Sequence, residues 1–143
     1  MRRDKDRDLS RQMHDALSAL PYLCWHNAKR ALAQLGSDAR YVEGWVVMPD
    51  GRPVEHGWCE VGEQIVDPTL PDVDLTYFAG LRFDAKQVKL LDREPYTPIV
   101  RQLYGCNGRG SSEYRAAFDS ARHYAETHPH QHGGNQRWIS SKR

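Results

Sequence analysis

The central segment, residues 41–67, constrains the fold most, because it alternates strand-forming runs with turns. Residues 41–48 and 54–61 are rich in β-branched and aromatic side chains, and the residues between them are typical of a turn. Gly62-Glu63 predicts a two-residue hairpin turn, after which the chain returns over residues 64–67. We therefore predict a three-stranded antiparallel meander at the centre of the chain.

The hairpin register places a histidine and an aspartate on one face of this meander. With Gly62-Glu63 as the turn, Trp58 pairs with Asp67, and directly paired residues point to the same face. His56 lies two residues before Trp58 and shares that face, which makes Asp67 its diagonal neighbour. Diagonal pairs lie about 7–8 Å apart at the backbone, within reach of long or aromatic side chains. A turn one residue longer or shorter would instead move Asp67 to the opposite face.

A cysteine stands where the second predicted helix begins. An amphipathic pattern over residues 10–20 predicts a first helix, which Pro21 ends. The apolar spacing from Cys24 to Leu35 predicts the second helix, with Gly36 as its stop. The unpaired N–H groups at a helix N-terminus favour negative charge, and the thiolate is the reactive form of cysteine. Cys24 is therefore well placed to act as a nucleophile.

Cys24, His56 and Asp67 together match what a thiol nucleophile, its base and the group that orients the base require. Each residue also has a plainer interpretation. Cysteine often packs in a core, a lone histidine often makes a structural hydrogen bond, and aspartate before proline often starts a turn. The helix start, the paired strands and the shared face favour the catalytic interpretation of the three. Cys59 points away from His56 by strand alternation, and we interpret Cys59 and Cys106 as packing or incidental residues.

The second half of the sequence predicts smaller elements. They are a strand within residues 75–83, a short helix capped by Asp84, a short helix ending near Tyr104, and a helix from Ser111 or Ser112 to about Glu126. The chain has the usual length of one domain. We expect a charged lead-in over residues 1–9, a single α+β domain over residues 10–127 and a flexible tail over residues 128–143.

Composition argues against several classes of function. The 143 residues carry 20 basic and 19 acidic side chains, so a net charge of +1 gives no reason to expect nucleic acid or a membrane as partner. The N-terminus lacks the apolar stretch of a signal peptide, so we expect a cytoplasmic protein. The three cysteines form neither a disulfide framework nor a CxxC pair. His128, His130 and His132 could bind a metal weakly, but we interpret them as part of the tail and expect no metal and no cofactor.

Three stretches of the sequence resemble the transglutaminase-like family. Cys24-Trp25-His26-Asn27-Ala28 resembles its nucleophile motif, in which a cysteine followed by an aromatic residue opens a helix. His56-Gly57-Trp58-Cys59-Glu60-Val61 is similar to its His-Ala-Trp-x-Glu-Val strand, and Val66-Asp67-Pro68-Thr69 to its Val-Asp-Pro-Thr segment. Small bacterial and phage proteins with Cys-x-x-Asn-Ala and Tyr-Val-Glu-Gly-Trp patterns are also similar, the second pattern matching Tyr41-Val42-Glu43-Gly44-Trp45. The resemblance covers residues 22–70.

The resemblance implies a papain-like α+β fold, in which the helix that carries the nucleophile packs on an antiparallel sheet and further helices follow. It implies Cys24 as nucleophile, His56 as base and then acid, and Asp67 as the orienting group. The sequence departs from the family pattern at Gly57, where alanine is common, and in Pro21-Tyr22-Leu23, where a glycine is usual.

The predicted function is a cysteine-dependent acyl-transfer enzyme: an amide or peptide hydrolase, a deamidase or a transglutaminase-type transferase, with a protein or peptide as substrate. The alternative is a non-catalytic peptide-binding module on the same fold. For the oxyanion hole, the backbone N–H of Cys24 is a natural donor at a helix start, and Gln12, Asn27 and Tyr41 are candidates for the second donor. Three tryptophans are candidates for lining a substrate groove: Trp25, Trp45 and Trp58. The oligomeric state is left open.

Overall fold

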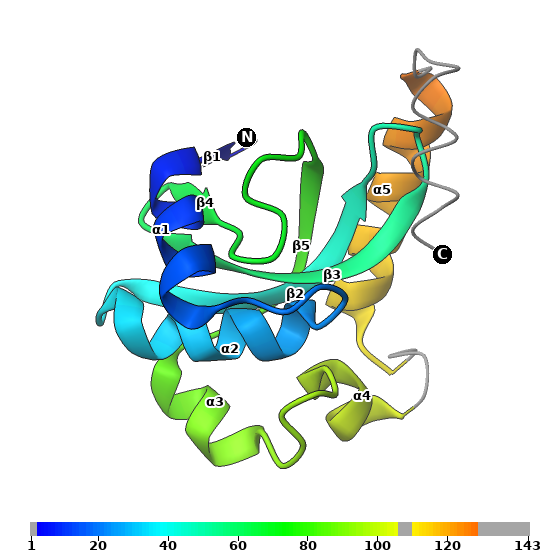
Figure 1. Cartoon of the computed structure of the whole chain (residues 1–143). Helices are drawn as coiled ribbons and strands as arrows, with labels where there is room; N and C mark the ends of the chain where they lie inside the picture. The colour runs from blue at the N-terminus through cyan, green and yellow to red at the C-terminus, as the bar shows by residue number, and fades with distance from the viewer. Residues whose placement is uncertain (1–2, 106–109, 129–143) are drawn as a thin grey trace.

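In the computed structural model, which describes residues 3–105 and 110–128, five strands form one curled sheet in the order β1-β4-β3-β2-β5 (Figure 1). β1 runs parallel to β4, and the other neighbouring strands are antiparallel. The strands are β1 Asp4–Lys5, β2 Ala39–Val47, β3 Pro53–Val61, β4 Gln64–Val66 and β5 Thr76–Phe83. The helices are α1 Arg7–Leu17, α2 Cys24–Leu35, α3 Ala85–Leu91, α4 Ile99–Tyr104 and α5 Ser112–Thr127. The class is α+β, as predicted.

The predicted meander is confirmed together with its register. Val61 pairs with Gln64 and Cys59 pairs with Val66 across the two-residue turn. Gly62 opens that turn with φ +59°, in the left-handed region that favours glycine. The meander corresponds to β2, β3 and β4, and the strand expected within residues 75–83 is β5, which pairs with β2.

The predicted helices are present with small shifts of their ends. α2 has the predicted bounds and ends before Gly36. α3 is capped by Asp84, and α5 is capped by Ser111, whose side chain accepts from the N–H of Tyr114. Cys106 and most of the predicted tail, residues 129–143, lie outside the described residues.

The N-terminal segment differs from the lead-in predicted over residues 1–9, because β1 and the start of α1 occupy it. Asp6 caps α1, and its own N–H donates to the carbonyl of Ile65 at 2.8 Å. Lys5 Nζ donates to the carbonyls of Leu70 at 2.8 Å and Val73 at 2.6 Å, residues that lie 65 and 68 positions later. Because these partners are so distant in sequence, the local charge pattern contains no sign of them.

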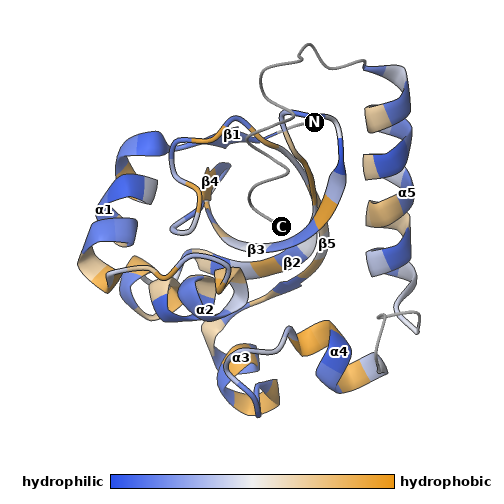
Figure 2. Cartoon of the chain, turned by 45° about the vertical axis from the view of Figure 1, so that its right-hand side comes forward, coloured by the Kyte–Doolittle hydropathy of each residue, from blue (hydrophilic) through white to orange (hydrophobic). Residues whose placement is uncertain are grey.

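The two faces of the sheet carry separate apolar clusters. On one face α2 packs against β2 and β3, and Ala28 and Leu32 join Tyr41 and Cys59 in a buried cluster. The other face carries a second cluster of Val42, Val46, Trp58 and Ile65. α5 lies along β5 at the edge of the curled sheet (Figure 2). The thiol of Cys59 donates to the carbonyl of Ala28 at 3.1 Å, so Cys59 packs against α2, as predicted.

Among the described residues, no helix combines the length and the apolar character that a bilayer span requires.

Candidate active site

Cys24 lies in the first turn of α2, as the sequence predicts. The turn before it places Tyr22 in the left-handed region, with φ +67°, and the Asn27 N–H donates to the carbonyl of Leu23 at 2.8 Å. This N-terminus has no side-chain cap among the described residues, so the first N–H groups of the helix surround the cysteine without intrahelical partners. Cys24 is 9% exposed, so the thiol is almost enclosed.

His56 and Asp67 are hydrogen-bonded on the face that the hairpin register predicts for both. His56 Nε2 lies 2.9 Å from Asp67 Oδ2, and both residues are buried. Trp58 shares this face, with its ring 6.1 Å from the imidazole between centroids. Because the carboxylate engages Nε2, Nδ1 is the ring nitrogen left for another partner.

The charge and hydrogen bonding of Cys24 are among the causes that raise the pKa of the same imidazole. Burial alone lowers the pKa of His56, but the charges and hydrogen bonds of Asp67 and Cys24 outweigh burial and raise this pKa to about 10. Burial alone raises the pKa of Asp67, but the charge and hydrogen bond of His56 outweigh it and lower this pKa to about 2. The site therefore favours an imidazolium held against an ionised carboxylate.

The Asp67 carboxylate is positioned on both of its oxygens. Tyr77 Oη donates to Oδ2 at 2.6 Å, and the backbone N–H groups of Thr69 and Leu70 donate to Oδ1, each at 3.1 Å. The Asp67 N–H donates to Ser10 Oγ at 2.9 Å. These contacts leave the carboxylate one orientation, with Oδ2 toward His56.

The sequence pattern does not identify Tyr77, Ser10 or Lys5 as supports of this site. The positive charge of Lys5 helps to lower the pKa of Asp67. Tyr77 lies in a predicted strand, but the face it shares depends on the order of the strands. The Asp-Pro-Thr sequence does signal the contacts with Thr69 and Leu70, since aspartate commonly accepts from the backbone two or three residues later.

Asn27, a predicted oxyanion donor, has both ends of its side chain engaged. Its amide oxygen accepts from the Leu20 N–H at 3.2 Å, and its amide nitrogen donates to the Leu20 carbonyl at 2.8 Å and to Thr69 Oγ1 at 2.9 Å. The side chain is fully buried. Asn27 therefore ties the start of α2 to the segment that follows Asp67.

The other candidate donors lie in different environments. The backbone N–H of Cys24 is in the uncapped first turn of α2. Gln12 is exposed on α1. Tyr41 is fully buried, and its hydroxyl donates to Glu43 Oε2 at 2.5 Å. Of these candidate oxyanion donors, the backbone N–H of Cys24 is the one that belongs to the same residue as the thiol.

The three tryptophans predicted to line a groove occupy separate places. Trp25 packs over Gly57, where an added Cβ would lie 2.7 Å from Trp25 Cδ1. An alanine at this position would collide with the indole, so Gly57 makes room for Trp25. The Arg101 guanidinium lies 5.3 Å from the Trp25 ring centroid. Trp58 and Trp45 each line a different groove.

A second buried carboxylate, that of Glu43, holds the N-terminus of α4. Its Oε2 accepts from Tyr41 Oη and from the N–H of Ile99, both at 2.5 Å, and its Oε1 accepts from the N–H of Val100 at 2.7 Å. Burial raises the pKa of Glu43, and these hydrogen bonds oppose the shift without cancelling it. A charged residue within an apolar strand is a signal of such a partner, although the partner cannot be named from the sequence.

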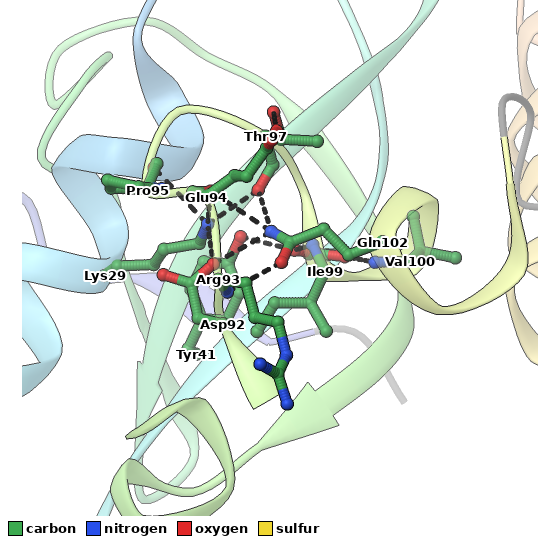
Figure 3. Close-up of polar contacts among 11 residues, drawn as sticks. Lys29, Tyr41, Asp92, Arg93, Glu94, Pro95, Thr97, Ile99, Val100 and Gln102 are labelled. Atoms are coloured by element: carbon green, nitrogen blue, oxygen red, sulfur yellow. Dashed lines mark hydrogen bonds and ion pairs between the residues drawn. The ribbon is translucent and has the colours of Figure 1, made fainter. Parts of the chain in front are cut away.

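Lys29 organises the segment that leads to α4 (Figure 3). Its Nζ donates to Asp92 Oδ1 at 2.9 Å and to the carbonyl of Thr97 at 2.7 Å. Gln102 joins the same cluster by donating to Asp92 Oδ1 at 2.9 Å. The cluster joins α2 to α4 and is separate from the hydrogen bonds of His56 and Asp67.

Comparisons of the sequence with protein-family models and curated proteins, and of the fold with solved structures, find no match. The chemistry of the site is therefore argued from its geometry. A thiol at a helix start, an imidazole on a neighbouring strand and a fixed carboxylate behind it are the groups that nucleophilic acyl transfer uses.

Proposed function

We propose that the protein is a cysteine-dependent acyl-transfer enzyme with a transglutaminase-like, papain-like fold. Cys24 is the nucleophile, His56 the base and then the acid, and Asp67 the group that orients the imidazole. The observation that carries this proposal is the 2.9 Å hydrogen bond from His56 Nε2 to Asp67 Oδ2, made while Cys24 acts on the same imidazole. The packing of α2 against an antiparallel sheet supports the fold assignment.

In the proposed reaction, the Cys24 thiolate attacks the carbonyl carbon of a carboxamide, forming a C–S bond and a tetrahedral oxyanion. The backbone N–H of Cys24 donates to this oxyanion. The C–N bond then breaks, and His56 gives its proton to the departing amine, which leaves a thioester. Water or a second amine, deprotonated by His56, attacks the thioester, and the C–S bond breaks to restore the thiol. Water gives hydrolysis or deamidation, and an amine gives transfer to a protein or peptide.

The experiment that tests the proposal is the pH dependence of Cys24 alkylation by iodoacetamide, read by mass spectrometry of the peptide that contains it. Free cysteine has a midpoint of about pH 8.5. An activated thiol labels fast and has a midpoint well below that value. The midpoint should move up in both variants, because His56→Gln removes the positive charge that favours the thiolate and Asp67→Asn removes the carboxylate that keeps the imidazole protonated. Far-ultraviolet circular dichroism checks that each variant is folded.

Two internal controls sharpen this experiment. Cys59 is fully buried, and burial raises its pKa, so it should stay unlabelled while the protein is folded. His26 lies in the same turn of α2 but packs against Tyr96, with ring centroids 4.4 Å apart and the ring planes tilted by 40°, so His26→Gln should leave the midpoint unchanged. If labelling is slow, and if its midpoint is that of an ordinary cysteine and does not move in His56→Gln, the proposal of an enzyme is overturned. The peptide-binding module would then be favoured.

A further inference from the structure

The loop that carries Asp67 contains turns and bends but neither a helix nor a strand. It spans residues 67–75 and joins β4 to β5, and we call it the Asp67 loop. His56 meets the carboxylate at the first residue of this loop, so their 2.9 Å hydrogen bond depends on what holds the loop in place. Side chains from residues 5–14, which we call the N-terminal clamp, bind it along its length. They are Lys5, Arg7, Ser10, Arg11 and His14.

Two residues of α1, one helical turn apart, hold the start of the Asp67 loop. Ser10 is fully buried, and its Oγ accepts from the Asp67 N–H at 2.9 Å. His14 Nδ1 lies 2.7 Å from the carbonyl oxygen of Pro68, which can only accept, so Nδ1 carries the hydrogen. Residues four apart on a helix share a face, so α1 holds the backbone on both sides of the Asp67–Pro68 bond.

Two arginines of the N-terminal clamp bind the far part of the loop. Arg7 donates to the carbonyl of Asp72 at 3.2 Å and pairs with the carboxylate of Asp74. Arg11 pairs with the carboxylate of Asp72. All four side chains are exposed, and exposed ion pairs contribute little to stability. The arginines therefore guide the loop, and a less exposed group has to fix it.

Lys5 is that group, because it binds the middle of the loop from a partly buried position. Its Nζ donates to the carbonyls of Leu70 at 2.8 Å and Val73 at 2.6 Å. Nζ also lies 5.5 Å from the centroid of the Tyr77 ring, and the hydroxyl of that ring donates to Asp67 Oδ2 at 2.6 Å. Lys5 therefore contacts both the loop and the ring whose hydroxyl orients the carboxylate.

The charges around Lys5 connect it to the carboxylate. Three charged side chains face it: Asp67, Arg7 and Asp74. Burial is the largest cause and lowers the pKa of Lys5, the two carboxylates oppose this shift, and the guanidinium adds to it. In return, the charge of Lys5 helps to lower the pKa of Asp67. The neighbours that raise the pKa of His56 are Asp67 and Cys24, so Lys5 acts on the imidazole through the carboxylate.

The second buried carboxylate has the same arrangement around it. Lys29 Nζ donates to the carbonyl of Thr97 at 2.7 Å and lies 5.8 Å from the centroid of the Tyr41 ring, whose hydroxyl donates to Glu43 (Figure 3). Each lysine thus joins a loop to a tyrosine that donates to a buried carboxylate. The carboxylate on the Lys5 side is the one that binds an imidazole, so Lys29 offers a matched control.

We propose that the N-terminal clamp positions the Asp67 carboxylate against His56, and that Lys5 is the main positioning residue of the clamp. By holding two loop carbonyls and the Tyr77 ring, Lys5 keeps Oδ2 of Asp67 directed at the imidazole. It acts on the orientation of the carboxylate and takes no part in bond making. Only the consequence for catalysis rests on the proposed function, because the contact between carboxylate and imidazole does not require a reactive thiol.

The test measures the pKa of His56 by nitrogen–proton correlation spectra of the histidine rings, assigned with His56→Gln. The full-length protein carries Cys24→Ala throughout, so that the thiolate does not contribute. Lys5→Gln should lower the pKa of His56 by about one unit, as expected when a hydrogen bond between charged groups loosens. Loss of a nearby positive charge alone would raise this pKa, because it stabilises the imidazolium. The sign of the shift therefore separates positioning from a simple charge effect.

Two further variants complete the test. Ser10→Ala changes no charge but removes the acceptor of the Asp67 N–H, so it should also lower the pKa of His56. It carries the test of the clamp if Lys5→Gln does not fold, which far-ultraviolet circular dichroism checks. Lys29→Gln is the matched control and should leave the pKa of His56 unchanged, because its hydrogen bonds are made at the other carboxylate site.

An unchanged or raised pKa of His56 in Lys5→Gln would overturn the assignment of Lys5, and an unchanged pKa in Ser10→Ala would overturn the clamp. An equal fall in Lys29→Gln would also overturn the inference, since it would indicate a general loosening of the fold. In the protein that keeps Cys24, Lys5→Gln should move the midpoint of Cys24 labelling up. If the pKa of His56 falls while wild-type Cys24 labels like an ordinary cysteine, the clamp is supported and the proposed catalysis is overturned, so the two failures can be told apart.

Discussion

Asp67 and Glu43 are both fully buried carboxylates, yet their surroundings have opposite effects on their charge. Asp67 faces His56 and has Lys5 nearby, and its pKa is lowered to about 2. Glu43 receives its hydrogen bonds from a tyrosine hydroxyl and two backbone N–H groups, and burial raises its pKa. At Glu43 the positive charge of Lys29 is the smallest of the causes that oppose burial, whereas at Asp67 the charge of the directly bonded His56 is the largest. A positive charge in direct contact is therefore what keeps a buried carboxylate ionised.

The comparison also separates two tasks within one small domain. The Asp67 carboxylate holds the imidazole that, in the proposed mechanism, exchanges a proton with Cys24. The Glu43 carboxylate holds the first turn of α4. Its hydrogen-bond partners among the described residues are the Tyr41 hydroxyl and the N–H groups of Ile99 and Val100, and no imidazole is among them. The following four predictions test this difference, from the largest expected effect to the smallest.

Asp67→Asn should have the largest effect. It removes the charge that holds the imidazolium, so we expect a loss of about 3 kcal/mol in the free energy of unfolding. Cys24 labelling at mildly acidic pH should slow by about tenfold or more. Glu43→Gln should cost about 1 kcal/mol and leave the labelling unchanged. Denaturant unfolding and alkylation of the two variants provide the measurement, and equal slowing in both would contradict the assignment of separate tasks.

The pH dependence of stability should differ in sign between the two carboxylates. The pKa of Asp67 is about 2 in the fold against 3.8 ordinarily, so its contribution is present above pH 3.8 and is lost as the pH falls toward 2. The pKa of Glu43 is raised above 4.5, so ionising it as the pH rises beyond 4.5 lowers the stability.

His56 should dominate the alkaline side of the same curve. Its pKa is raised from 6.5 to about 10, so its contribution is complete below pH 6.5 and is lost as the pH rises through 10. Urea unfolding at a series of pH values measures all three groups. A His56→Gln curve parallel to wild type between neutral and alkaline pH would refute the His56 part, and an Asp67→Asn curve parallel to wild type below about pH 4 would refute the Asp67 part.

Tyr77→Phe and Tyr41→Phe form a matched pair, because each removes one hydroxyl donor from one carboxylate. Loss of the bond from Tyr77 to ionised Asp67 should cost about 1.5–3 kcal/mol. Loss of the bond from Tyr41 to Glu43 should cost less, about 0.5–1.5 kcal/mol, because burial raises the pKa of Glu43 and disfavours a charged acceptor. Thermal unfolding of both variants at one acidic pH makes the comparison, and equal losses would indicate that the two carboxylates carry the same charge.

Gly57→Ala should have the smallest effect on the charge difference between the two carboxylates. The added methyl group lies against Trp25, so we expect a loss of about 1 kcal/mol or slightly more in stability. It removes no charge, so the dependence of stability on pH, followed by the same urea unfolding series, should keep its shape. A changed shape would mean that packing at Trp25, next to Cys24, also sets the charge of the imidazole.

Local sequence patterns predict the parts of the site that depend on short separations. Gly62-Glu63 is typical of a two-residue turn, and that turn alone decides that His56 and Asp67 share a face. The helix that starts at Cys24 likewise follows from its apolar spacing and from the proline before it. The predicted lead-in over residues 1–9 does not match the structure, since its charges bind segments far along the sequence.

The sequence by itself determined the α+β class, the meander, the helix of the nucleophile and the shared face of His56 and Asp67, because turn chemistry and residue periodicity act over a few residues. Only the tertiary structure decided that Tyr77, Ser10 and Lys5 gather around Asp67. It also decided that Glu43 holds α4 and that Trp58 and Arg82 line one groove. These partners meet through the order of the strands, and strand order is set by burial and pairing across the whole sheet, which no local pattern encodes.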